Sequence, residues 1–195
     1  MRMRSLKCAI YEDGDFMFLE EAKKLLTENN ISFELQEFTN EKEYWHHTML
    51  FPYTNNAKNC KVIAIIVKSN NGNKHIELQF NAVDNDFVFD DLRFGGFCYE
   101  LFDVPEKQLK EELLSIITEI VKGNIGIIVV NDLKKKKWLS DGSFDLSDED
   151  DTFGKQGYEE AIAHIKRPKR FLDKLFKSKK QYEIYDWNTY QCIIK

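Results

Sequence analysis

The stretch that decides the fold is KVIAIIVKSNNGNKHIELQFN, residues 61–81. Residues 62–67 are all apolar, and a continuous run of this length predicts a strand that is buried on both faces. Asn71-Gly72 is the strongest short signal for a β-hairpin turn. Residues 75–81 then alternate between polar and apolar side chains, which predicts the returning strand. The core is therefore expected to rest on antiparallel strands joined by a tight turn.

The segment that follows the hairpin adds strands and one clear helix. Residues 87–103 are rich in aromatic side chains and predict one or two strands, with Gly95-Gly96 at a bend or bulge. Asp103 and Glu106 have the spacing of a capping box, Pro105 lies in the first turn, and Gly123 is expected to cap the helix end. Residues 125–130 predict a second buried strand. Five apolar residues at helical spacing are expected to share one core with the two buried strands: Leu109, Leu113, Ile116, Ile117 and Ile120.

The two ends of the chain complete the architecture. Residues 6–12 predict a first strand, 16–28 an amphipathic helix and 31–36 a half-buried strand, whereas 39–59 predict either an ordered irregular segment or a short helix and a loop. Residues 158–177 predict two helices, or one helix kinked at Pro168, and a hairpin is expected around residues 186–188. We therefore expect a single domain spanning 1–195. Its class is α+β, with a mixed, largely antiparallel sheet and three to four helices packed on one face.

Net charge, hydrophobic runs and cysteine spacing indicate which classes of protein this chain can belong to. The net charge of -5 disfavours general binding to nucleic acid, because phosphate repels an acidic surface. No signal peptide and no membrane-spanning run are expected, which predicts a cytoplasmic protein. The cysteines are scattered and form no C-x-x-C pair, which predicts reduced thiols: Cys8, Cys60, Cys98 and Cys192.

No sequence motif fixes a chemistry. The G-x-S-x-G, Walker, G-x-G-x-x-G and H-E-x-x-H patterns are all missing, so neither an enzyme nor a cofactor is expected. His46 and His47 precede Cys60, but adjacent residues point in different directions and rarely bind one metal together. Four acids around residues 87–89 predict either a charged loop rim or, as the alternative function, a hydrolase or nuclease with a carboxylate cluster: Asp84, Asp86, Asp90 and Asp91.

The sharpest local signal is the acidic segment 141–151, which is expected to form a polar loop after the basic run 134–137. It holds six acids and no basic residue. Two interpretations stay open: an electronegative surface that meets a basic partner, or a solvated loop balanced by nearby lysines. The basic stripe in residues 166–180 is interpreted as the solvated face of a surface helix. The acids are Asp141, Asp145, Asp148, Glu149, Asp150 and Asp151.

Three segments, residues 94–102, 131–144 and 182–195, resemble parts of small bacterial immunity proteins encoded beside polymorphic toxins, including contact-dependent growth inhibition systems. The resemblance implies a cytoplasmic, non-enzymatic inhibitor that binds its cognate toxin domain, expected to be a basic nuclease, and blocks the active site. The residues themselves suggest that the six acids bind this partner, with Trp138, Phe144 and Trp187 as candidate aromatic anchors. A regulatory binding domain unrelated to toxins is the other non-enzymatic alternative.

Overall fold

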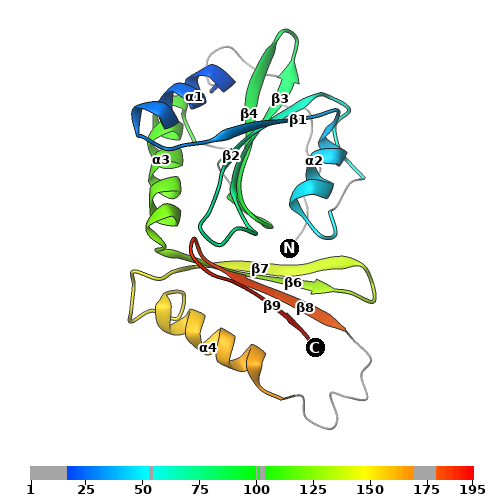
Figure 1. Ribbon diagram of the computed structural model, residues 1–195, viewed down its shortest axis with the longest axis vertical. Helices are drawn as coiled ribbons and strands as arrows, with labels where there is room; N and C mark the ends of the chain where they lie inside the picture. The colour runs from blue at the N-terminus through cyan, green and yellow to red at the C-terminus, as the bar shows by residue number, and fades with distance from the viewer. Residues whose placement is uncertain (1–16, 53–54, 100, 102–103, 169–178) are drawn as a thin grey trace.

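The computed structural model describes residues 17–52, 55–99, 101, 104–168 and 179–195, and it confirms the α+β class (Figure 1). In the described residues the strands form two sheets rather than one, and every pair of neighbouring strands is antiparallel, in keeping with the largely antiparallel arrangement that we expected. The elements in chain order are α1 (Leu19–Glu28), β1 (Glu34–Phe38), α2 (Glu41–Thr48), β2 (Val62–Val67), β3 (Ile76–Val83), β4 (Asp86–Phe94), β5 (Phe97–Tyr99), α3 (Glu106–Lys122), β6 (Ile125–Asp132), β7 (Lys137–Asp145), α4 (Lys155–Lys166), β8 (Lys180–Tyr185) and β9 (Tyr190–Ile194).

Sheet A is the five-stranded sheet with order β1-β2-β3-β4-β5, and its centre is the predicted hairpin. Strands β2 and β3 pair from Val67 opposite Ile76 to Val62 opposite Asn81. Gly72 takes a positive φ of 69° in the turn, and the Asn71 side chain accepts hydrogen bonds from the backbone N–H groups of Asn73 and Lys74. The predicted hairpin is confirmed. Strand β1 pairs with the other edge of β2, and β4 pairs with the other edge of β3, both antiparallel.

Helices cover both faces of sheet A, not one face as expected. All six residues of β2 are buried, so both of its faces need a cover. Ile63 and its alternate neighbours pack with α1 and α3, whereas Ala64 and its neighbours pack with Tyr44 of α2. Figure 1 shows α1 and α3 on one side of the sheet and α2 on the other. Residues 39–59 thus begin with the short helix that was one of the two alternatives.

Helix α3 supplies the predicted apolar stripe. Leu109, Leu113, Ile117 and Ile120 are buried in the core cluster, and Ile116 is partly buried against it. Gly123 ends the helix in the left-handed conformation with φ 81°, as predicted. The N-terminal residue differs, because Pro105 rather than Asp103 is the N-cap and makes no side-chain cap. Asp103 and the predicted strand 6–12 lie outside the described residues.

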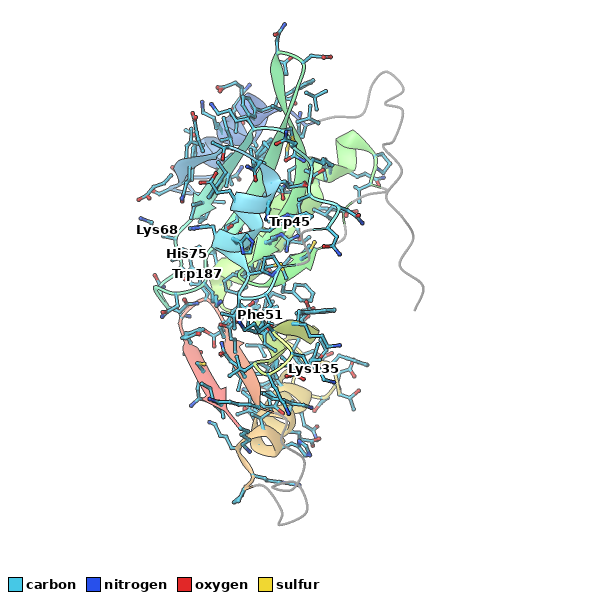
Figure 2. The ribbon with its side chains drawn as sticks, turned by 90° about the vertical axis from the view of Figure 1, so that its right-hand side faces the viewer. Trp45, Phe51, Lys68, His75, Lys135 and Trp187 are labelled. Atoms are coloured by element: carbon cyan, nitrogen blue, oxygen red, sulfur yellow. The ribbon has the colours of Figure 1, made fainter. Side chains whose placement is uncertain are left out.

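Sheet B is the four-stranded sheet with order β7-β6-β8-β9, and one of its faces meets an end of sheet A. Tyr185 of β8 is fully buried at this junction. Its hydroxyl donates to the carbonyl oxygen of Phe94 at 2.9 Å and accepts from the N–H of Gly96 at 3.0 Å. Figure 2 shows Phe51 and Trp187 at the level where the two sheets meet. Ile127 and Val129 of β6 join the α3 core there, so alternate residues of both predicted central strands share that core.

The other face of sheet B packs on α4. Ile128 and Ile184 of the sheet contact Tyr158 and Ile165 of the helix in a separate buried cluster. Helix α4 ends at Lys166, shortly before Pro168, and the expected second helical part falls on residues 169–178, outside the described residues. The final hairpin of β8 and β9 is confirmed. No helix in the described residues is long and apolar enough to cross a membrane.

Candidate functional site

The predicted partner-binding residues do not form one loop. The segment 137–145 is strand β7, so Asp141 and Asp145 lie on a sheet and only the acids from Asp148 onward lie in the turn that leads to α4. Trp138 and Asp145 stand at opposite ends of this strand. Seven residues of extended chain separate them by about 23 Å. The set therefore splits into an acidic turn, residues 145–151, and a second group around Trp138.

Hydrogen bonds within the acidic turn hold its backbone in place. The Asp145 carboxylate accepts from the N–H of Ser147 at 2.9 Å, and the Asp148 carboxylate accepts from the N–H of Asp150 at 3.1 Å. The Asp151 carboxylate accepts from the N–H of Phe153 at 3.3 Å. The hydroxyl and the N–H of Ser147 stabilise the ionised form of Asp145 and lower its pKa. Asp145, Asp148 and Asp151 thus stabilise the backbone of the turn and also contribute to its negative charge.

The charge of the acidic turn is only partly balanced. The Glu149 carboxylate pairs with the Lys155 ammonium group at 3.0 Å, and both side chains are exposed. Residues 145–155 hold five acids and one lysine, which leaves a net charge of -4. The expected balance by nearby lysines is thus met by one residue, Lys155. The rest of the turn keeps the electronegative surface that the other interpretation expects.

Two of the three candidate anchors pack against hydrophobic clusters of the fold. Phe144 points toward α4, where its ring centre lies 5.4 Å from that of Tyr158. Trp187 is 6% exposed, and its ring lies 6.4 Å from that of Phe94. Aromatic packing of this kind stabilises a core and leaves little surface for a partner. Trp187 is therefore buried, and Phe144 is partly covered by its packing on α4.

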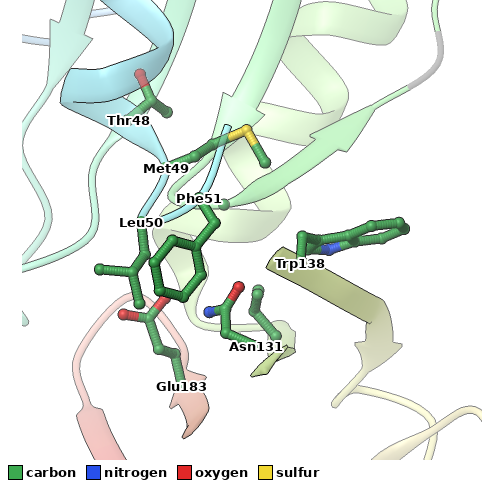
Figure 3. Close-up of a pocket in the computed structure, with 9 residues that line it drawn as sticks. Thr48, Met49, Leu50, Phe51, Asn131, Trp138 and Glu183 are labelled. Carbon is green, nitrogen blue, oxygen red and sulfur yellow. The ribbon is translucent and has the colours of Figure 1, made fainter. Parts of the chain in front are cut away.

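Trp138 remains available, because 37% of it is exposed. It lines a small hollow between the two sheets, which has room for about one water molecule. Figure 3 shows Leu50, Phe51 and Trp138 around the opening, with Asn131 and Glu183 at its floor. The other lining residues are Thr48, Met49, Gly96 and Val129.

Asp141 lies on the same face of sheet B as Trp138. The two residues pair with Val129 and Asn131 of β6, which are two positions apart on that strand. Asp141 is exposed as a residue, yet burial around its carboxyl group raises the pKa, while the Trp138 indole and the charge of Arg93 act in the opposite direction. The carboxylate thus stands where the two sheets approach each other, away from the acidic turn.

A buried polar layer under α2 was missed by the sequence reasoning. It consists of the polar side chains that β3 and β4 turn toward α2: Glu77, Gln79, Asn81, Asp91 and Arg93. Glu77 pairs with Arg93 and Gln79 with Asp91 in the strand register, so the four share one face. The Arg93 guanidinium contacts the Asp91 carboxylate at 2.6 Å, and both side chains are almost fully buried.

Helix α2 and the neighbouring strand supply further polar contacts to the buried polar layer. The Thr48 hydroxyl donates to the Glu77 carboxylate at 2.8 Å, and the Cys98 thiol lies 2.9 Å from the Asp91 carboxylate. Burial raises the pKa of both Glu77 and Asp91. Among the described residues, the Nε of Arg93 and the Oε1 of Gln79 are buried without a hydrogen-bond partner. The alternation of residues 75–81 signalled a polar face, but it gave no sign that α2 would cover that face.

The other candidate groups do not converge. Asp90 pairs with Lys58 at 2.7 Å and Asp91 with Arg93, whereas Asp84 and Asp86 lie at the turn between β3 and β4. The described residues contain no group of three side chains placed to bind a metal ion. The ring of His47 instead packs 5.3 Å from that of Phe38.

Comparisons with known proteins add no relative. No protein-family model, no curated protein and no solved structure matches this chain. Sheet B carries two candidate binding features: the acidic turn after β7 and the exposed Trp138 beside the hollow.

Proposed function

We propose that this chain is an immunity protein, which binds a basic toxin domain, expected to be a nuclease, and blocks its active site. The observation that carries the proposal is the acidic turn, which presents a net charge of -4 over residues 145–155 on an exposed surface. A nuclease cleft is basic because it must attract phosphate. An acidic surface that enters such a cleft would compete with the substrate and would be drawn to it by its charge.

The internal hydrogen bonds of the acidic turn support this role. Asp145, Asp148 and Asp151 each accept a backbone N–H, so the turn is ordered before any partner arrives. Ordering a loop during association costs free energy, and a preformed turn avoids much of that cost. The side chains of Glu149 and Asp150 are exposed and lie at the tip, where they would meet the partner first.

Trp138 is the natural anchor for the same partner. An exposed tryptophan beside a hollow matches the residue type that dominates the binding energy of many interfaces. An interface that covers both Trp138 and the acidic turn must run along β7 for about 23 Å, which fits a standard interface of about 800 Å² per partner. We expect the charges to set the association rate and Trp138 to set the dissociation rate.

The covered carboxylates favour binding over catalysis. Glu77 and Asp91 are the most buried acids of sheet A, and α2 lies over them. A hydrolase or nuclease would need such groups to converge on an open pocket that admits substrate. The hollow beside Trp138 holds about one water molecule, which is too little for a nucleotide.

The decisive experiment is protection from the product of the neighbouring gene, which the proposal expects to carry the toxin domain. Co-expression of the chain should restore growth of cells that produce that domain, and the purified pair should bind with an association rate that falls as salt rises. Replacing Glu149→Gln together with Asp150→Asn should slow association without unfolding the protein. The matched control pair, Glu20→Gln with Glu28→Gln on α1, should leave the rate unchanged. Failure to protect and failure to bind would refute the proposal.

Trp138→Ala provides the second arm of that experiment. We expect it to speed dissociation and to change the association rate little, because an anchor acts after the encounter. If the acidic variant and Trp138→Ala both bind like the unchanged chain, the inhibitor role would need another surface.

A further inference from the structure

In the part of the chain that the structure describes, strand β7 is an edge of sheet B. Its one neighbour among these described strands is β6, and β9 forms the opposite edge. An edge strand carries a row of backbone N–H and C=O groups that can pair with another strand. Because β7 runs for nine residues, it is long enough to serve as a template for association.

A hydrogen bond at the end of β7 shows which of its backbone groups point away from β6. Asp145 donates its N–H to the carbonyl oxygen of Phe153 at 3.1 Å, which lies on the side away from β6. Alternate residues of a strand direct their backbone groups to the same side, so Asp141 and Ser143 also point outward. Within the described residues, no backbone partner is found on that side for either of them. A bulge at Leu139, where the register with β6 shifts, ends the regular part of the edge.

The two ends of β7 carry opposite charges. Lys134, Lys135, Lys136 and Lys137 precede or begin the strand, and all four are exposed. The acidic turn follows at the other end. Figure 2 shows Lys135 in the half of the molecule that holds sheet B. The edge is therefore basic at one end and acidic at the other, with Gly142 at its centre between Asp141 and Ser143.

The charges of such an edge are complementary to those of a second copy related by a two-fold axis. Antiparallel pairing about Gly142 places Asp141 opposite Ser143 of the second copy, and both residues direct their backbone groups into the new pair. The same two-fold axis brings Lys134 and Lys135 to the end that holds Asp150 and Glu149 of the second copy. Parallel pairing would instead set lysine beside lysine. Gly142 also leaves the axis free of side chains.

We propose that two copies of this chain associate through antiparallel pairing of their β7 strands about Gly142, so that the two four-stranded sheets join into one of eight strands. A two-fold interface of this kind repeats each contact twice, and both ends of the pair contribute. The inference does not depend on the proposed function. Because a toxin and a second copy would both use the acidic turn, the two would exclude each other.

The test measures the mass of the chain alone by sedimentation velocity over a range of concentrations. The unchanged chain should shift from 23.1 kDa toward twice that mass as concentration rises, and less so at high salt. The variant Lys134→Glu with Lys135→Glu places acids opposite Asp150 and Glu149 of the second copy, and Glu149→Lys with Asp150→Lys places lysines opposite Lys135 and Lys134. Each alone should raise the dimer Kd by about tenfold or more, because like charges now face each other.

The mixture of the two variants decides the matter. An equimolar mixture should form a mixed dimer, because every end then joins acid to base, and the four changes combined in one chain should restore the self-dimer. Hydrogen exchange should show protected amides at Asp141 and Ser143 in dimers and unprotected ones in monomers. A chain that stays monomeric at all concentrations, variants that dimerise unchanged, or a mixture that fails to pair would each overturn the proposal.

Discussion

The two faces of sheet A are built by the same strands, yet one buries hydrocarbon and the other buries charge. Ile76, Leu78 and Phe80 of β3 face α3 and are fully buried. The residues between them, Glu77 and Gln79, face α2 and are also buried. Burial of the first set stabilises the fold through the hydrophobic effect. Burial of the second set costs free energy unless every charge and polar atom finds a partner.

The difference suggests separate roles for the two faces. The apolar face accounts for the stability of sheet A, and the polar layer depends on the few contacts that compensate its buried charges. The pair of Asp91 and Arg93 is the main compensation, since the two side chains touch at 2.6 Å. Substitutions on the two faces should therefore lower the free energy of unfolding for different reasons: loss of apolar burial on one face and an unpaired buried charge on the other.

The largest effect is expected on the polar face. Arg93→Met leaves the Asp91 carboxylate buried without its cation and should lower the free energy of unfolding by about 3–5 kcal/mol. Chemical denaturation of the variant measures this change. The double variant Asp91→Leu with Arg93→Met should recover much of the loss, because it removes the unpaired Asp91 charge together with its cation. A double variant as unstable as the single one would show that shape, not charge, dominates this face.

On the apolar face, Leu113→Ala tests the core formed by α3. Leu113 is fully buried, and its truncation should cost about 2–5 kcal/mol through lost burial and a remaining cavity. Thermal and urea unfolding give the value. The exposed residue Val121 on the same helix is a matched control, and Val121→Ala should change stability by about 0.5 kcal/mol or less. Equal effects at both positions would contradict the core assignment.

A smaller loss is expected where the two sheets meet. Tyr185→Phe removes the hydroxyl that joins Phe94 to Gly96, at a cost of about 1–3 kcal/mol. The packing of the ring is kept, so the variant should still fold. Equilibrium unfolding followed by two probes, tryptophan fluorescence and circular dichroism, measures the loss. No change in stability would mean that the ring alone holds the junction.

The smallest effect concerns the pH dependence of the polar face. Burial raises the pKa of Glu77 above its usual value of 4.5, so this carboxyl is harder to ionise in the fold than in the unfolded chain. Its ionisation removes stability as pH rises above 4.5, and protonation restores that stability as pH falls. The stability of Glu77→Gln relative to the unchanged chain should therefore increase between pH 4.5 and neutral pH. Urea titrations at several pH values test this, and a constant difference would contradict it.

The sequence predicted the local elements well and their assembly poorly. The hairpin of β2 and β3, the stripe of α3 and the cap at Gly123 all have local signals, and all are confirmed. The division into two sheets has no such signal, because strand pairing depends on distant partners. Residues 141–145, the second half of β7, were expected to lie in a loop because Gly142 and the acids Asp141 and Asp145 are weak strand formers. Pairing with β6 overrides that local preference.

In the candidate site, a single inserted residue likewise has no local sequence signal, and it changes where two aromatic side chains point. Trp138 and Phe144 are six positions apart, so a regular strand would place both on one face. The bulge at Leu139 inserts an extra residue and turns Trp138 to the opposite face. Phe144 consequently packs on α4, while Trp138 faces the hollow. Residues 148–151 lie outside the helices and strands, as predicted, because clustered acids disfavour regular structure.

The strand order of sheet B has a consequence for how the chain acquires its structure during synthesis. Sheet A is assembled from strands that follow one another, and all five precede α3 in the chain. The central strand β6, by contrast, must wait for β8, which begins at Lys180, near the end of the chain. Contacts between distant segments form slowly, because a long loop must close first. One edge of β6 is therefore left without its partner until β8 has been synthesised, and we expect the nascent chain to be most prone to aggregation in that interval.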